Sequence, residues 1–147
     1  MHRLIVGISA LSVALVAVSA WAVEDPILTR KKLMDANGAA AGAASAMVKE
    51  EIPFHPGVAK AALQAFNSVA YSYGDYFPEG SDTGDTKASP KIWEDPEGFA
   101  AALAKFQADS DAALAADPQD LEAFKAAFGQ VAANCQSCHE AFRLSDN

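Results

Sequence analysis

The sequence predicts an all-α protein built as a bundle of four helices, and two observations support this prediction. The first is composition: beyond residue 22 the chain is rich in Ala and other strong helix formers and has almost no β-branched runs. The second is a series of four amphipathic segments separated by Pro- and Gly-containing breakers. Four helices of about 20 residues with mostly short connections favour a four-helix bundle.

Residues 1–22 are expected to lie outside this bundle. They consist of a basic start at residues 1–3, an apolar run at residues 4–20 and the small-x-small site Ala20-Trp21-Ala22. This order predicts a secretory signal peptide that is cleaved after Ala22. The alternative, an uncleaved anchor helix, fits less well because the apolar run is slightly shorter than the roughly 20 residues of a membrane span. The mature domain is therefore predicted to be residues 23–147, with no membrane insertion after cleavage.

The mature chain is predicted to be acidic. Removal of residues 1–22 removes one arginine, so ten basic residues face nineteen acidic ones and the net charge is −9. This balance disfavours binding to nucleic acid and to anionic membranes, and it is neutral or favourable toward basic protein partners.

The first two helices are delimited by prolines. The first is expected at about residues 25–51, with Pro26 in its first turn and Pro53 and Pro56 beyond its end. Its inner face is marked by a seven-residue recurrence of Ile27, Met34, Ala41 and Val48. The second is expected at about residues 57–76, followed by a loop at residues 77–95 that is rich in Gly, Asp, Ser and Thr. Its inner stripe consists of Leu63, Phe66, Val69 and Tyr73.

An Asp-Pro pair predicts the start of each of the last two helices. The third opens with Asp95-Pro96 and the fourth with Asp117-Pro118, in each case an N-cap followed by proline at the first helical position. The apolar face of the third is Phe99, Leu103, Phe106 and Leu114. The face of the fourth is Leu121, Phe124, Phe128, Val131, Cys135, Cys138, His139 and Phe142, at spacings typical of a helix with one buried side.

Cys135-Gln136-Ser137-Cys138-His139 is a C-x-x-C-H motif, the pattern for attachment of a c-type haem. Two thiols must add to two vinyl groups on one edge of the porphyrin, and the neighbouring imidazole must reach the iron. Positions three and four apart on a helix point the same way, which suits this chemistry. Predicted export, the absence of other cysteines and a bundle able to enclose a flat apolar ring agree with one covalent haem c.

Two other uses of the cysteines compete with haem attachment. A C-x-x-C dithiol of the thioredoxin kind belongs at the start of a helix near a βαβ pattern, whereas this motif lies near the end of a predicted helix. A zinc site would need two further ligands, and His55 is the one other histidine of the mature chain that could serve as a nitrogen ligand.

Three residues could bind the iron opposite His139: Met34, Met47 and His55. Met34 is favoured because Gly38, Ala41, Gly42 and Ser45 share its helix face and leave space for a planar ring. This small-residue strip could instead serve close helix packing. Met47, thirteen residues on, points away from Met34, and a methionine in a helix is often core filler. Arg30 is a candidate contact for a haem propionate, and Arg143 is a candidate contact on the His139 side.

The chain resembles the class II cytochromes c, the family of cytochrome c-prime and its low-spin relatives. The resemblance is strongest from Ala126-Ala127-Phe128-Gly129 through the haem motif to Glu140-Ala141-Phe142-Arg143, near the C-terminus. It extends to Ser89-Pro90-Lys91-Ile92-Trp93 and to the segment from Arg30 to Gly38. The resemblance implies an antiparallel four-helix bundle, often dimeric, located in the bacterial periplasm.

The resemblance also separates two functions. Members with a non-ligating distal residue have five-coordinate iron that binds small gases, whereas low-spin members place a methionine where this chain has Met34. A Met34/His139 haem implies a one-electron carrier with a redox-protein partner, and not an enzyme. The competing expectations are a binder of nitric oxide or carbon monoxide, and a thiol oxidoreductase that uses Cys135 and Cys138.

Overall fold

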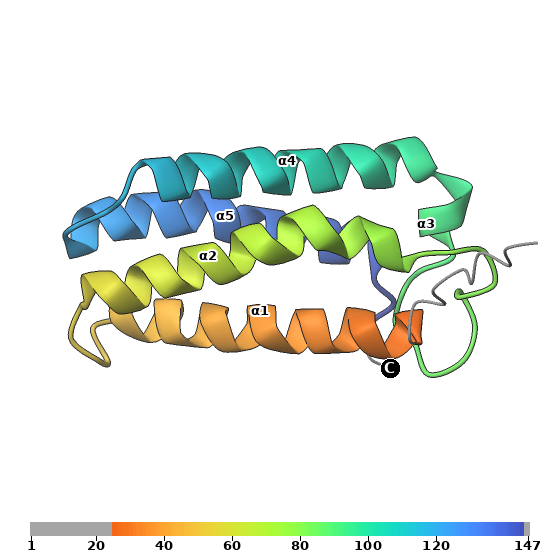
Figure 1. The fold of residues 1–147 in the computed structure, drawn as a ribbon, viewed down its shortest axis with the longest axis horizontal. Helices are drawn as coiled ribbons and strands as arrows, with labels where there is room; N and C mark the ends of the chain where they lie inside the picture. The colour runs from red at the N-terminus through yellow and green to blue at the C-terminus, as the bar shows by residue number, and fades with distance from the viewer. Residues whose placement is uncertain (1–24, 146–147) are drawn as a thin grey trace, which may run out of the picture.

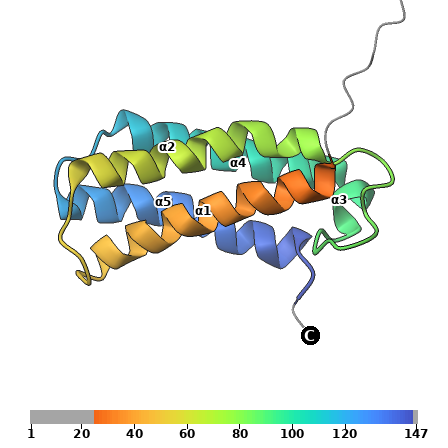
Figure 2. The ribbon, with the colours of Figure 1, turned by 60° about the horizontal axis from the view of Figure 1, so that its bottom comes forward.

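The computed structural model describes residues 25–145, so the predicted signal peptide lies outside the described residues. The elements are α1 (Pro26–Val48), α2 (Pro56–Ser72), the 3₁₀ helix η1 (Tyr73–Tyr76), α3 (Lys91–Glu94), α4 (Pro96–Ala115) and α5 (Leu121–Phe142). The four long helices lie side by side and alternate in direction (Figures 1 and 2). This arrangement confirms the predicted antiparallel four-helix bundle.

Apart from one isolated bridge between Ala88 and Arg143, residues 25–145 form no β-structure. None of the helices in this range combines the length and the apolar character that crossing a membrane requires. The bridge ties the long loop before α3 to the end of α5, close to the haem motif.

Side-chain caps start all four long helices. Asp25 accepts hydrogen bonds from two backbone amides of α1, and His55 accepts one from the amide of Gly57 in α2. Asp95 and Asp120 cap α4 and α5 in the same way, at Gly98 and Ala123. These caps satisfy amides that have no partner within the helix, and they fix where each helix begins.

The structure departs from the predicted elements in four places. The last helix begins at Leu121, after the cap Asp120, and not at Asp117-Pro118, because Asp117 has a positive φ of 40° that belongs to the turn. The first helix ends at Val48, before the prolines, because Glu50 adopts φ 59°. The expected loop at residues 77–95 contains the short helix α3, and residues 73–76 of the second helix are 3₁₀.

The main core lies between the four long helices. Its largest fully buried side chains are Phe66, Phe124, Met47, Leu63 and Val131. A second cluster around Ile92, Phe99 and Phe142 lies at the α3 end and packs against Cys138. The haem motif is therefore at the border of this aromatic cluster, while the main core occupies the rest of the bundle.

Candidate haem crevice

The three residues of the motif lie on the last turns of α5. Cys135 and Cys138 are half-buried, and the two sulfurs are not joined to each other. His139 follows Cys138 directly and is exposed on the protein surface. The thiols and the imidazole therefore face an opening in the bundle, as haem attachment by this motif requires.

This opening is a crevice made of two adjoining hollows of about 250 and 210 Å³. The two hollows share the lining residues Met34, Tyr73, Cys138 and His139. The larger one, the charged hollow, is lined by four cationic and two acidic side chains: Arg30, Lys31, Lys87, Arg143, Asp35 and Asp85. The smaller one, the apolar hollow, has walls that include Gly38, Ala41, Ala102, Leu103 and Phe106.

The walls of the crevice fit a flat, mostly apolar group with acidic substituents at one end. A Cβ added at Gly38 would have no neighbour within 4 Å, and the same is true at Gly42. Neither glycine therefore makes a close helix contact among the described residues, and Gly38 opens the apolar hollow instead. The buried Oδ1 of Asn37, another lining residue, has no hydrogen-bond partner among the described residues.

The three candidates for the second axial position lie in different places. Met34 of α1 lines both hollows together with His139 of α5. Met47 is fully buried in the main core and lines neither hollow. His55 caps α2, where its Nδ1 accepts the Gly57 amide at 3.2 Å. Only Met34 of these three shares the crevice with the motif.

Arg30 has a role that the sequence did not reveal. Its side chain is buried, and its guanidinium donates to the carbonyl of Tyr76, to the hydroxyl and carbonyl of Ser81 and to the hydroxyl of Thr86. It also lies 4.6 Å from the centre of the Phe77 ring. Arg30 thus holds the loop after η1 against α1. Contact with a propionate stays a prediction for this residue.

Arg143 ends α5 beside the motif. Its backbone amide donates to the carbonyl of His139 at 3.1 Å, and its side chain contributes to the charged hollow. Burial, and to a lesser extent the charge of Arg143, lower the pKa of His139. Both effects favour the neutral imidazole, which is the form that binds a metal.

The cysteines do not have the character of redox-active thiols. Burial raises the pKa of both Cys135 and Cys138. Reactive thiols have a lowered pKa and often lie at a helix N-terminus, whereas this pair is near the C-terminal end of α5. Within residues 25–145, no three His, Cys, Asp or Glu side chains gather in a way that could hold a metal ion.

Tyr73, Asn37 and Asn134 also line the crevice but were not singled out as site residues. Tyr73 contributes to both hollows, and burial raises its pKa to about 12, partly opposed by the charge of Arg30. Its place on the inner stripe of the second helix was the available signal. The amides are harder to find, because their importance depends on which helices meet at this point.

Comparison with known proteins gives consistent matches over this chain. The family model described as cytochrome c' matches residues 25–143. Cytochrome c-556 of Agrobacterium fabrum is 38% identical over 115 residues, which are 78% of each chain. Cytochrome c' of Rhodopseudomonas palustris is 38% identical over 120 residues, 81% of this chain and 82% of the relative. The solved structure of cytochrome c' from Rhodopseudomonas palustris superposes with a TM-score of 0.80 at 36% identity, covering 85% of this chain and 100% of that chain.

Proposed function

Because this chain belongs to the cytochrome c' family, the class II cytochromes c, and binds one covalent haem c, we propose that it is a periplasmic one-electron carrier with His139 and Met34 as axial ligands. The observation that carries the proposal is the position of Met34, which lines both hollows together with His139. A thioether and an imidazole from two different helices thus share the walls of one crevice.

The roles of the surrounding residues follow from the crevice. Cys135 and Cys138 would hold the haem through two thioethers, and the haem supplies reversible one-electron chemistry when bound. The apolar walls around Leu103 and Phe106 exclude water, and a low dielectric limits reorganisation around a changing charge. Cations of the charged hollow, among them Lys31 and Lys87, suit the propionate end.

Gas binding is the competing function. The relatives include proteins named cytochrome c' as well as proteins named cytochrome c-556, so family membership is compatible with both functions. Electron transfer and gas binding differ in whether Met34 occupies the second axial position of the iron. A redox-protein partner belongs to the same proposal, because a one-electron carrier needs a donor and an acceptor. Export and association with a second copy are proposed as well, on the N-terminal sequence and on the family respectively.

Addition of carbon monoxide to the ferrous protein tests the proposed function. We expect the parental protein to show low-spin absorption bands that the gas leaves unchanged, because Met34 occupies the position that the gas needs. Met34→Ala is expected to lose the low-spin bands and to gain a carbon monoxide-dependent shift. Met47→Ala, in the core and outside the crevice, is the matched control and should retain the parental spectrum.

The opposite pattern would support the gas-binding function. In that case the parental ferrous protein would show high-spin bands that shift with carbon monoxide, and Met34→Ala would change little. The comparison of the two methionine variants separates loss of a ligand from general loosening of the bundle.

A further inference from the structure

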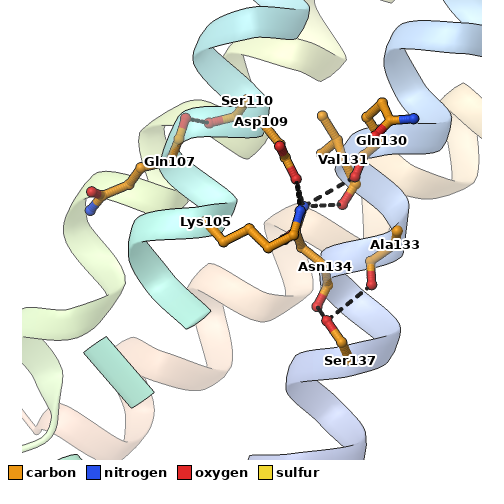
Figure 3. Close-up of polar contacts among 9 residues, drawn as sticks. All are labelled: Lys105, Gln107, Asp109, Ser110, Gln130, Val131, Ala133, Asn134 and Ser137. Carbon is orange, nitrogen blue, oxygen red and sulfur yellow. Dashed lines mark hydrogen bonds and ion pairs between the residues drawn. The ribbon is translucent and has the colours of Figure 1, made fainter. Parts of the chain in front are cut away.

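A polar network joins α4 to α5 through Asp109 and Asn134 (Figure 3). The Nδ2 of Asn134 donates to Oδ2 of Asp109 at 2.7 Å and to the carbonyl of Gln130 at 3.1 Å. Asn134 is 5% exposed, lines the apolar hollow and immediately precedes Cys135. Lys105 forms an ion pair with the same carboxylate of Asp109.

The carboxylate of Asp109 is not part of the wall of the apolar hollow, but it is hydrogen-bonded to Asn134, which lines that hollow. Ala102 and Phe106, seven and three residues before it on α4, both line that hollow, so Asp109 continues the same helix face. Its side chain is 23% exposed, whereas that of Lys105 is 62% exposed. Hydrogen bonds from Lys105 and Asn134 lower the pKa of Asp109, which keeps the carboxylate charged at neutral pH.

We propose that Asp109, held in place by the positioning residue Asn134, lowers the reduction potential of the haem. This inference rests on the proposed one-electron function. A negative charge beside the crevice stabilises the oxidised state of the haem, which carries one more positive charge than the reduced state. Lys105 offsets this effect only in part, because its more exposed charge is screened more strongly by solvent and salt.

The bundle contains a second Asn–Asp hydrogen bond that serves as a matched control for the pair Asp109 and Asn134. Asn67 of α2 donates to Asp111 of α4 through an Asn–Asp hydrogen bond that is also 2.7 Å long. Tyr71 donates to the second oxygen of Asp111 at 2.6 Å. Asp109 and Asp111 both line neither hollow, and the difference between the pairs is the asparagine: Asn134 lines the apolar hollow, whereas Asn67 lines neither hollow. Asp111→Asn therefore removes a carboxylate and weakens a helix contact of the same kind, but one whose partner is not part of the crevice wall.

Voltammetry of the haem-loaded full-length variants tests the inference. We expect Asp109→Asn to raise the reduction potential and Lys105→Met to lower it by a smaller amount. Asn134→Ala should raise the reduction potential by less than Asp109→Asn does, because the carboxylate of Asp109 remains but loses its hydrogen bond to α5. Asp109→Glu, which keeps the charge, should stay near the parental value, and Asp111→Asn should be unchanged.

Equal shifts in Asp109→Asn and Asp111→Asn would overturn the inference, as would no shift in Asp109→Asn. If Asp109→Asn does not mature, Asn134→Ala and Lys105→Met decide: shifts of opposite sign support the inference, and any other pattern overturns it. Carbon monoxide binding by the parental protein would remove the carrier function but leave this test intact, because the potential is measured without the gas.

Discussion

A variant with serine at both Cys135 and Cys138 is expected to carry no covalently bound haem. Serine hydroxyls cannot form the thioethers, and the remaining attachment would be coordination by His139 and Met34, which does not survive denaturation. The measurement is the mass of the purified, denatured protein, which should equal that of the bare mature polypeptide. The parental protein should be heavier by one haem.

Ser137→Ala is the matched control for this variant, because Ser137 is on the same turn of α5 but its side chain is exposed. Its hydroxyl donates to the carbonyls of Ala133 and Asn134, within the same helix. This control should retain one covalent haem. A parental protein with the mass of the bare polypeptide, produced by a host that matures c-type cytochromes, would contradict haem attachment by the two cysteines.

Phe124→Ala is expected to lower the free energy of unfolding by about 3–5 kcal/mol, the usual cost of removing a large aromatic side chain from a packed core. Phe124 is fully buried, and its ring centre lies 5.8 Å from that of Phe128 and 5.9 Å from that of Phe54. The loss follows from the cavity and the broken ring contacts. Chemical denaturation of the haem-loaded protein measures it.

Ile52→Ala provides the comparison for this prediction, because Ile52 is 42% exposed in the connection between α1 and α2. We expect it to cost less than about 1 kcal/mol, since a half-exposed side chain loses little burial. Similar losses in the two variants would mean that Phe124 does not belong to the stabilising core.

Much of the fold could be predicted because local signals agree with it. Proline and capping residues mark the starts of α1 and α4, and the apolar stripes identified the buried faces. The predicted helix boundaries were wrong where the backbone conformation of one residue overrides the local sequence pattern. Asp117-Pro118 resembles a helix start, but Asp120 provides the cap and Asp117 takes a positive φ. Such choices depend on how the turn packs, which periodicity does not describe.

The site was predictable in part for a related reason. The C-x-x-C-H motif is local, and the small residues on the helix face of Met34 indicated that this methionine lines the crevice, which it does. Arg30 was harder, because its buried contacts are to residues about 50 positions away in a loop without a regular pattern. The same holds for the bond between Asn134 and Asp109, which exists only because α4 and α5 are neighbours.

The overall charge of the chain and the charge of the crevice have opposite signs. The full sequence has a net charge of −8, yet the charged hollow is lined by Arg30, Lys31, Lys87 and Arg143. One of these cations, Lys31, forms an ion pair with Asp85 of the same hollow. The net charge of the chain therefore does not describe the charge of this hollow.

The methionine methyl groups offer the most direct test of the central claim that Met34 and His139 occupy the two axial positions. In ferrous protein labelled with ¹³C at the methionine methyls, the ring current of the porphyrin should move the Met34 signal far upfield. The signal of Met47, in the main core, should stay near its ordinary position, and Met34→Ala should remove the shifted signal. If both mature-chain methyls resonate at ordinary positions, Met34 is not a ligand and the carrier proposal is wrong.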